Sequence, residues 1–495
     1  MGSWEIRNQM RRRVAQEEGV LRKGAALNVA LCHPAAYPVA MSSLGFQAIY
    51  REVHAHPDAA AERAFLPDDP GEHRRSRTPV FTYENERPLA DFPVLAFSVA
   101  YELEITGVFE MLDLCGIPAL RAERESGRAR HPFILAGGPQ TASNPAILLP
   151  FVDALVVGEG EDVLRQVLDI LVGAERRDWR ALLARVPGCH VPGVTTDAPA
   201  PVRAPDGRLP ACSQIVTADT VLSSMFLVEA GRGCSRRCAY CVMRGPRCGG
   251  MRAVPMEEVL RRIPAGARRV GLVGAAVTDH PQIREIVREV VSGGGAAGRE
   301  IGLSSLRADR LDEELVRLLA AGGCRTLTTA SDGASQRMRD LAGRDTGERH
   351  ILRAAEFARD AGIGRMKLYE MIGFPGETLD DIDELVRFAL ELSKVVPLSL
   401  TVSPFVAKKG TPLGDAPFEA IPSLEAKLAR TRSGLRGKVE VKPASVRAAW
   451  LEHMLSQGGE SAGLAALDAW RGGGRFAAWR RAFAAIQGGD APLAP

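Results

Sequence analysis

Three cysteines stand close together near the middle of the chain, Cys234, Cys238 and Cys241, in the segment GRGCSRRCAYC. Three thiolates at this spacing are typical of a metal site. A closed zinc site needs a fourth ligand, and Cys248, seven residues after the third cysteine, is a candidate. A 4Fe–4S cluster held by three cysteines instead leaves one iron open to bind a small molecule. The spacing alone leaves both alternatives open.

Positive charge and an aromatic ring surround these cysteines. Arg236 and Arg237 lie between the first two, and Arg244 follows the third. Guanidinium groups would offset the negative charge of a cluster held by thiolates, because opposite charges attract at short range. Tyr240 directly precedes the third cysteine. These neighbours favour the iron–sulfur alternative over a structural zinc site.

The elements that must position the cysteines belong to a repeating pattern in residues 223–412. A buried strand followed by an amphipathic helix recurs six times there. Six such units predict a partial (β/α)6 barrel, an open relative of the TIM barrel, with its site at the carboxyl ends of the strands. The cysteines follow the first strand directly. We expect the strands at 225–231, 268–274, 300–306, 325–331, 365–373 and 398–406.

Residues 26–172 form a second α/β region. Apolar runs at 26–32, 92–101, 132–140 and from 153 onward alternate with helical patterns. This alternation predicts a Rossmann-like, doubly wound parallel sheet with helices on both faces, which binds ligands at its strand ends. Glycines allow a ligand to approach the backbone closely. Two expected strands are followed by such glycines: Gly137, Gly138, Gly158 and Gly160.

The remaining segments are expected to be an N-terminal extension (1–25), a Pro-rich linker (173–222) and a small, α-rich C-terminal extension (413–495). Between Lys427 and Arg447 the last of these is locally basic. A solvated face is one explanation, and a contact with RNA or another acidic partner is the second.

Composition restricts the class of protein. The 495 residues include 63 Lys and Arg against 60 Asp and Glu, so the net charge of +3 gives no bulk attraction for nucleic acid. No apolar run reaches the roughly 18 residues that a membrane span needs. The polar N-terminus does not have the pattern of a signal peptide. Nine cysteines, mostly scattered, fit a reducing compartment. We therefore expect a cytoplasmic protein without a membrane span.

The cysteine spacing, with Tyr240 before the third cysteine, resembles the signature of radical S-adenosylmethionine (SAM) enzymes. The N-terminal half resembles the cobalamin-binding domain that is fused to many of these enzymes, in segments 136–145 and 156–164. As a whole the chain resembles an uncharacterised subgroup that carries this module. Three further segments are similar to strand ends of the branch that includes methylthiotransferases: GLVGAAVTDHP (271–281), SSLRADR (304–310) and KLYEMIGFPGET (367–378).

The resemblance implies the cofactors. Three cysteines would hold a 4Fe–4S cluster, and the amino and carboxylate groups of SAM would occupy the fourth position. One electron from a reductant such as flavodoxin or ferredoxin would then cleave SAM and give a 5′-deoxyadenosyl radical. The protein would position the substrate and exclude water while the cofactor supplies the chemistry.

The same resemblance implies roles at the first barrel strand ends. The backbone at Gly274 would receive the methionine amino group of SAM, unless the segment is a plain turn. Arg307 would pair with the methionine carboxylate, because a guanidinium binds a carboxylate through two parallel hydrogen bonds. An ion pair between Arg307 and Asp309 is the alternative. Tyr240 would also lie at the cofactor.

Later strand ends would contact the remainder of SAM. Ser331 and Asp332 would bind the ribose or the amino group, although the family usually has Glu where Asp332 stands. The turn after the fifth strand would pack against adenine, or else it serves as the start of a helix. Its residues are Gly373, Pro375, Gly376 and Glu377.

The N-terminal domain departs from the usual cobalamin pattern, Asp-x-His-x-x-Gly. Its first strand ends Cys32-His33-Pro34 without the Asp and the Gly. His33 is one candidate ligand to cobalt, displaced from the usual position. Alternatively, cobalamin would bind without a protein ligand to cobalt, and the four strand-end glycines would flank its nucleotide tail. The alternative is a degenerate domain that caps the substrate or forms a dimer surface.

These observations predict a radical SAM enzyme, a transferase that carries out cobalamin-dependent methylation or a related radical reaction on an unknown substrate. The first alternative is a methylthiotransferase that modifies tRNA or protein, although the N-terminal half has no cysteine set for a second cluster. A second alternative is a non-catalytic zinc or iron–sulfur scaffold.

Overall fold

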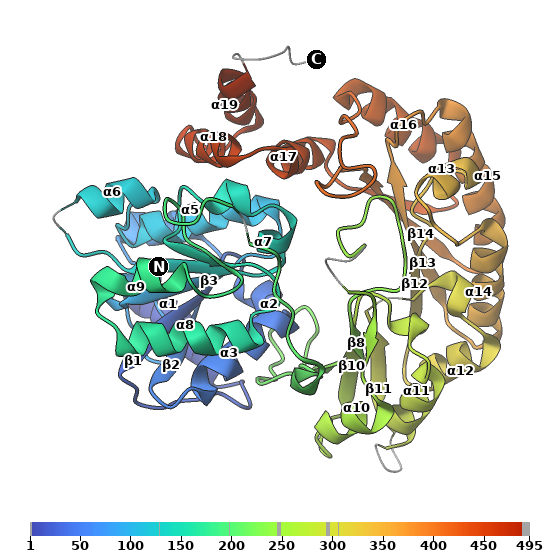
Figure 1. Ribbon diagram of the computed structural model, residues 1–495. Coiled ribbons are helices and arrows are strands. Elements are labelled where there is room, and N and C mark those ends of the chain that lie inside the picture. The colour runs from blue at the N-terminus through green and yellow to red at the C-terminus, as the bar shows by residue number, and fades with distance from the viewer. Residues whose placement is uncertain are drawn as a thin grey trace. The chain divides into compact units, whose positions relative to one another are not determined.

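The computed structural model describes residues 2–127, 129–197, 199–244, 249–293, 298–304 and 306–487. This part of the chain divides into two compact units (Figure 1). The first unit takes the chain up to Ser224 and again from Met454 onward, and the second is Met225–His453. Residues after 453 therefore return to the N-terminal unit. The finer five-part division expected from the sequence stays a prediction.

The first unit contains a six-stranded sheet of order β2-β1-β3-β4-β5-β6. The first five of these strands are parallel, and β6 runs antiparallel to β5. The expected parallel sheet is thus confirmed. Its strands are β1 (Leu27–His33), β2 (Ala59–Phe65), β3 (Val94–Ser98), β4 (Phe133–Gly137), β5 (Ala154–Val156) and β6 (Cys189–His190).

Helices cover this sheet and bury a large apolar core. Helix α3 packs against α8. Helix α18 packs against α5 and the turn Pro145–Leu148. Gly463 of α18 lies so close to that turn that an added Cβ would come within 2.2 Å of Ile147 O. The longer helices are α3 (Leu44–Ala55), α5 (Ile105–Leu114), α8 (Glu161–Gly173), α18 (Glu460–Arg471) and α19 (Phe476–Gln487). The division between the units falls within α17 (Val446–Gln457), whose residues from Met454 belong to the first unit.

The N-terminal segment is part of this unit. It begins with α1 (Ser3–Val14), which buries Ile6 and Met10 in the core. Arg63 of β2 then binds Glu17 (Nη2–Oε2, 2.7 Å) and Glu84 (Nε–Oε1, 2.5 Å) with all three side chains buried. Breaking a buried ion pair is costly, so this contact ties residue 17 firmly to the sheet.

The second unit is built from seven parallel strands in two sheets, of order β11-β10-β7 and β12-β13-β14-β15. All six expected strands are present, and β15 was not expected. Within the described residues no ladder joins β11 to β12; instead Thr329 Oγ1 donates to Leu306 O (2.7 Å). The strands are β7 (Phe226–Glu229), β10 (Arg269–Val273), β11 (Glu300–Leu303), β12 (Thr326–Ala330), β13 (Arg365–Ile372), β14 (Leu398–Pro404) and β15 (Glu440–Pro443).

Helices follow most of these strands and line one side of the sheets (Figure 1). This is the βα arrangement of a partial barrel, and it confirms the expected α/β class. The other face of each sheet, and the loops at the carboxyl ends, are left for a site. The helices are α10 (Met256–Arg262), α11 (Ile283–Ser292), α12 (Glu313–Ala321), α13 (Gln336–Leu341), α14 (Glu348–Asp360), α15 (Leu379–Ser393) and α16 (Ile421–Gly434).

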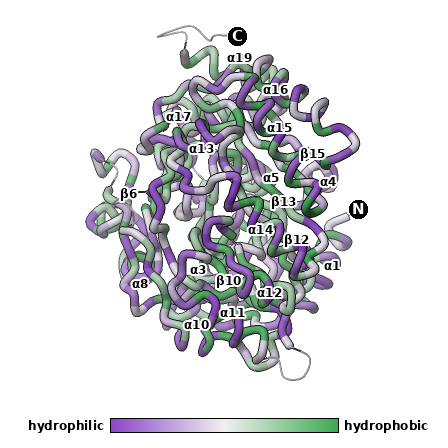
Figure 2. The backbone as a smooth tube through the Cα atoms, turned by 90° about the vertical axis from the view of Figure 1, so that its right-hand side faces the viewer, coloured by the Kyte–Doolittle hydropathy of each residue, from purple (hydrophilic) through white to green (hydrophobic). Residues whose placement is uncertain are grey.

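Hydrophilic and hydrophobic residues are mixed along the chain (Figure 2). Among the described residues, no helix is both long and apolar enough to cross a bilayer.

Candidate metal and cofactor site

The three cysteines lie in one loop at the carboxyl end of β7. This loop is closed by a short antiparallel pair, β8 (Gly231–Arg232) with β9 (Arg252–Ala253). Cys238 is buried and the thiols of Cys234 and Cys241 are partly exposed. Three thiols on a strand-end loop are the donor set that an iron–sulfur cluster needs. Among the described residues no three His, Cys, Asp or Glu side chains are gathered as a metal site.

The alternative zinc ligand, Cys248, lies outside the described residues.

Arg236 fastens the loop to the neighbouring strand ends. Its guanidinium makes two 2.7 Å hydrogen bonds to Asp279, which follows β10. It also lies 3.4 Å from Asp309 after β11 and 3.0 Å from Asp345 after α13. Burial by itself would raise the pKa of Asp279. The hydrogen bonds from Arg236 and Ser235 outweigh burial and lower this pKa to about 2. Arg236 was expected to offset cluster charge, but these carboxylates already neutralise it.

A second anchor lies on the other side of Cys238. The Tyr240 hydroxyl donates to Asp332 Oδ2 (2.8 Å), which also binds Arg344 Nε at 3.1 Å. Arg344 in turn interacts with the thiol of Cys238. Ala239 N donates to Ala342 O (2.8 Å) next to this group. Tyr240 and Asp332, both predicted site residues, are therefore brought together at the cysteine loop.

Arg307 and Gly274 end the neighbouring strands β11 and β10. Arg307 is 3% exposed and lies 3.1 Å from Asp309, yet its Nε and Nη2 have no hydrogen-bond partner among the described residues. The contact with Asp309 is an ion pair without an aligned hydrogen bond. Gly274 N donates to Ser304 Oγ (3.1 Å), and a Cβ at Gly274 would come within 2.7 Å of Gly231 O. Arg307 thus keeps buried donors that suit a carboxylate.

Ser331 is turned away from Asp332. Its hydroxyl donates to Glu370 Oε2 of β13, and both side chains are buried. Burial raises the pKa of Glu370 to about 8. Sequence reasoning missed Glu370. The available signal was an acid at an alternate position of an apolar strand, beside Met366, Leu368 and Ile372.

The turn after β13 is mainly structural. Glu377 has a buried side chain whose Oε1 accepts from Gly373 N (2.7 Å) and from Lys427 Nζ (2.9 Å). Burial raises the pKa of Glu377. Gly373 has φ +89° and a Cβ there would meet Leu424 of α16 at 2.7 Å. Only Pro375 and Gly376 of this predicted group are exposed.

The basic stretch after residue 427 is partly neutralised. Lys427 is buried between Glu377 and Glu419, and Arg430 makes two hydrogen bonds to Asp383. These pairs leave less free positive charge for the RNA contact that the sequence suggested.

The glycines at the strand ends of the first unit pack against their own chain. A Cβ at Gly138 (φ +102°) would lie 2.6 Å from Val99 O, and one at Gly158 (φ +105°) would lie 2.3 Å from Val202 O. Gly137 and Gly160 have looser surroundings, with nearest atoms at 3.8 and 3.4 Å. Two of the four glycines predicted to approach cobalamin are therefore already required by packing of the chain itself.

The sheet order nevertheless places a crevice between β1 and β3, the switch point of the flavodoxin-like order 2-1-3-4-5. His33 ends β1; it is 2% exposed, its Nδ1 has no partner among the described residues, and burial lowers its pKa to about 4. Tyr101, just beyond β3, is 46% exposed. The topology and these two side chains fit a flat cofactor at this edge.

The adjacent part of the edge is covered. Asn144 Nδ2, beyond β4, donates to Leu455 O (2.8 Å) and Gly458 O (3.0 Å) at the end of α17, and Ser456 Oγ donates to Glu102 (2.8 Å).

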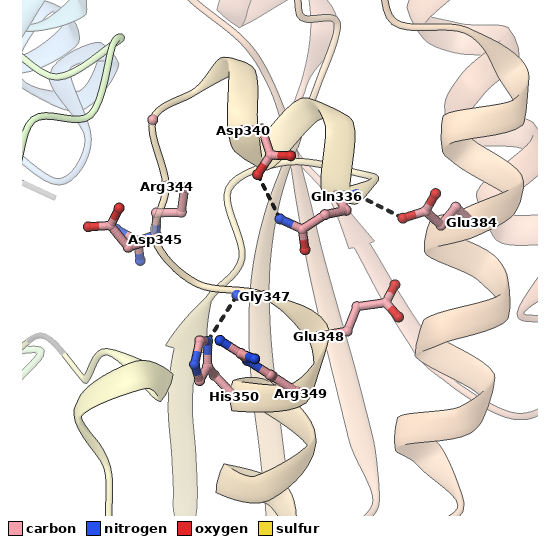
Figure 3. A pocket seen from close by; sticks show the side chains of 10 residues that line it. Gln336, Asp340, Arg344, Asp345, Gly347, Glu348, Arg349, His350 and Glu384 are labelled. Carbon is pink, nitrogen blue, oxygen red and sulfur yellow. Dashed lines mark hydrogen bonds between the residues drawn. The ribbon is translucent and has the colours of Figure 1, made fainter.

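A pocket of the second unit, about 680 Å³, lies between α13, α14 and α15 (Figure 3). Three of its lining residues, Gly343, Arg344 and Asp345, also lie against the cysteine loop. Its hydrogen bonds are internal, such as Gln336 N to Glu384 Oε1 (2.7 Å) and Gly347 N to His350 Nδ1 (3.1 Å). Acids and bases are mixed in the lining, which points to no particular ligand. Its charged side chains are Asp340, Arg344, Asp345, Glu348, Arg349, His350 and Glu384.

Comparison with known proteins decides the family. Residues 228–389 match the family described as Radical SAM superfamily, and residues 45–192 match the family described as Radical SAM proteins, N-terminal. The chain is a radical SAM protein. Membership in this superfamily of enzymes implies a 4Fe–4S cluster, SAM and a reductant.

Relatives of this radical SAM protein include enzymes and an uncharacterised protein. The uncharacterised protein MJ0966 of Methanocaldococcus jannaschii is 27% identical over 67% of this chain and 70% of its own length. The uncharacterised methyltransferase PH0819 of Pyrococcus horikoshii is 22% identical over 52% and 58%. The ribosomal protein uS12 methylthiotransferase RimO of Desulforudis audaxviator is 28% identical over 62% and 65%.

Among solved structures, the cobalamin-dependent SAM radical enzyme OxsB with aqua-cobalamin bound has a similar fold, with a TM-score of 0.53 and 14% identity. The similarity covers 83% of this chain and 56% of the OxsB chain, so the radical SAM protein spans little more than half the length of that neighbour. At this identity the likeness concerns the fold.

Proposed function

We propose that Cys234, Cys238 and Cys241 hold the 4Fe–4S cluster and that SAM binds at the carboxyl ends of β10, β11 and β12. The observation that carries this proposal is the position of the cysteine loop, which Arg236 and Tyr240 fasten to those strand ends. When bound, the cluster and SAM supply a 5′-deoxyadenosyl radical. The chain's own contribution is to orient SAM and to keep water from the reacting carbon.

Named residues would hold SAM. Arg307 would offer its buried Nε to the methionine carboxylate, since Nε has no hydrogen-bond partner among the described residues while Nη2 lies 3.1 Å from Asp309. The backbone at Gly274 would face the methionine amino group. Asp332 would accept from the amino group or ribose, with Tyr240 and Arg344 fixing its carboxylate. Ser331, Gly373 and Glu377 would support these residues rather than touch SAM. The Ser331 hydroxyl is bonded to Glu370, and the backbone N–H of Gly373 is bonded to Glu377.

The proposed reaction is methylation of an unactivated carbon, with cobalamin at the β1/β3 edge of the first unit. Support comes from the relative described as a methyltransferase and from the fold shared with a cobalamin-dependent enzyme. Cobalamin, when bound, carries a methyl group. His33 and Tyr101 are the residues that would contact it, and Gly137 and Gly160 would line its approach.

A methylthiotransferase reaction is favoured by one of the relatives. The cysteines of the first unit, Cys32, Cys115, Cys189 and Cys212, however, are scattered along the sequence without the close spacing of the cysteine loop. Methylation therefore ranks first.

The test is anaerobic reconstitution of the full chain with iron, sulfide and cobalamin. Dithionite and SAM are then added, and 5′-deoxyadenosine, iron and cobalt are measured. We expect about four irons per chain and formation of 5′-deoxyadenosine. Bound cobalt in a stoichiometric amount supports methylation. Zinc in place of iron, with no 5′-deoxyadenosine, would refute the proposal.

A further inference from the structure

A row of polar side chains follows the face of the β12–β15 sheet that the helices do not cover. Along β13, Met366, Leu368 and Glu370 are buried, whereas Lys367 and Tyr369 are not. Successive side chains of a strand point to opposite faces, so Lys367 and Tyr369 share the second face. Tyr369 is 39% exposed.

Lys367 and Tyr369 act together on this face. Lys367 Nζ donates to the Tyr369 hydroxyl at 2.7 Å and lies 4.5 Å from the centre of its ring. Lysine carries a compact, strongly hydrated charge that usually has an acid or water near it. Here the nearest acid of the same row, Glu440, pairs instead with Arg365 (3.4 Å) and Lys442 (3.1 Å).

The register of the sheet extends the row across four strands. Lys367 lies opposite Thr328 of β12, and Tyr369 lies opposite Thr401 of β14, which in turn lies opposite Lys442. Thr401 Oγ1 is buried and has no hydrogen-bond partner among the described residues. A buried hydroxyl without a partner costs free energy, and a polar ligand would restore its bond.

This row leads toward the proposed SAM site. Thr328 and Ala330 share one face of β12, and Asp332 lies two residues beyond the end of that strand. Four residues of a strand span about 13 Å. A ligand held at Lys367 would therefore extend along the strand toward the end where Asp332 and Tyr240 lie.

We propose that Lys367 and Tyr369, beside Thr401, bind the anionic group, a carboxylate or a phosphate, of a small substrate. Arg365, Lys367 and Lys442 against one acid, Glu440, give this face a positive charge. Because the Thr401 hydroxyl is shielded from solvent, Lys367 and Tyr369 would make the direct contacts with the anion. The inference rests on the proposed function and adds the substrate's chemical class to it.

Labelling of the full-length apoprotein with pyridoxal 5′-phosphate tests this inference. The probe combines a phosphate with an aldehyde. The Lys367 amine and the aldehyde form an imine with loss of one water, and borohydride then supplies the hydride that reduces the imine to a stable amine. Peptide mapping gives the labelling rate of each lysine. Exposed Lys394 serves as the matched lysine outside the row.

We expect Lys367 to be labelled about ten times faster than Lys394, a difference equivalent to about 1.4 kcal/mol. Millimolar inorganic phosphate or succinate should slow labelling at Lys367 alone, and whichever protects better identifies the anion. Lys367→Met should remove the fast site and leave labelling of Lys394 unchanged. Tyr369→Phe should weaken protection several-fold, with circular dichroism showing that both variants fold.

Equal rates at Lys367 and Lys394, or fast labelling that neither anion slows, would overturn the inference. Protection by a short single-stranded RNA but by neither small anion would overturn it in favour of nucleic acid. Labelling needs neither cluster nor SAM, so its failure is separate from failure to form 5′-deoxyadenosine.

Discussion

The carboxyl ends of the parallel strands carry different groups in the two units. In the second unit they hold charged side chains: Arg236 reaches Asp279 after β10 and Asp309 after β11, and Arg307 pairs with Asp309 in its own loop. In the first unit, close packing of the backbone at Gly138 and Gly158 occupies much of the corresponding edge. His33 and Tyr101 lie near the β1/β3 crevice of the same edge.

This difference shows that the carboxyl ends of parallel strands can serve two purposes. At one of them lies the buried Arg307, whose Nε has no hydrogen-bond partner among the described residues. Glycines with positive φ are retained where two segments of backbone must touch. Fold alone therefore does not locate the site, and the contacts of individual residues do.

The largest expected effect comes from removing a cluster ligand. Cys238→Ala should reduce 5′-deoxyadenosine formation by at least about 100-fold, because three protein ligands are needed to hold the cluster. Cys324→Ala, which changes a partly exposed cysteine elsewhere in the second unit, is the matched control and should leave activity unchanged. Iron content and the rate of 5′-deoxyadenosine formation are measured in both. Full activity of Cys238→Ala would place the chemistry elsewhere.

Arg236→Gln tests whether the ion pairs hold the loop. The change leaves Asp279, Asp309 and Asp345 without their shared cation, so the loop should loosen. We expect iron to pass to a chelator about 10-fold faster from the reconstituted variant, equivalent to about 1.4 kcal/mol. Arg236→Lys should slow the loss of iron only in part, since lysine cannot form both bonds to Asp279.

Arg284→Gln breaks an exposed ion pair with Asp312 and serves as the control. If it releases iron as fast as Arg236→Gln does, the effect is not specific to the cysteine loop.

Gly158→Ala tests the carboxyl-end edge of the sheet in the first unit. A Cβ would meet Val202 O at 2.3 Å in a backbone conformation that alanine rarely adopts. We expect a loss of about 2–3 kcal/mol in the free energy of unfolding, with unchanged 5′-deoxyadenosine formation per folded molecule. Gly173→Ala, at a position with open space, should change stability by less than about 1 kcal/mol. Unaltered stability together with lost cobalt binding would instead assign Gly158 to cobalamin.

The sequence predicts the strand–helix repeats well because their apolar periodicity is strong. It does not predict β2, whose residues AAAERAF are poor strand formers and whose charged pair, Glu62 and Arg63, suggests exposure. The structure buries that pair through Arg87, Glu17 and Glu84. Such partners lie far apart in the chain, so local patterns do not reveal them.

The same limit applies to the site. Cysteine spacing is local and identifies the candidate ligands, whereas the partner of each charge depends on tertiary structure. Arg236 and Glu377 are attractive candidates in the sequence for that reason, and both turn out to bind residues of the chain itself. Glu370 lies in a strand without any motif and was missed.

Glu370 gives the smallest expected effect, and it concerns pH. Burial raises the pKa of Glu370 to about 8, against an ordinary value near 4.5, so the folded chain binds a proton that the unfolded chain has lost between these values. The free energy of unfolding should therefore fall as pH rises from about 4.5 to about 8, and change no further above that. Glu370→Gln is neutral throughout and removes this contribution.

Chemical denaturation of the apoprotein at pH 5 to 9 measures the difference. We expect Glu370→Gln to gain stability relative to the parent as pH rises from 5 to 8. Glu313→Gln, on exposed α12, should give a difference close to zero at each pH. A difference for Glu370→Gln that does not change with pH would mean that Glu370 is ionised in the fold. The Ser331–Glu370 pair would then belong with the charged groups of the strand-end site rather than with the core beneath it.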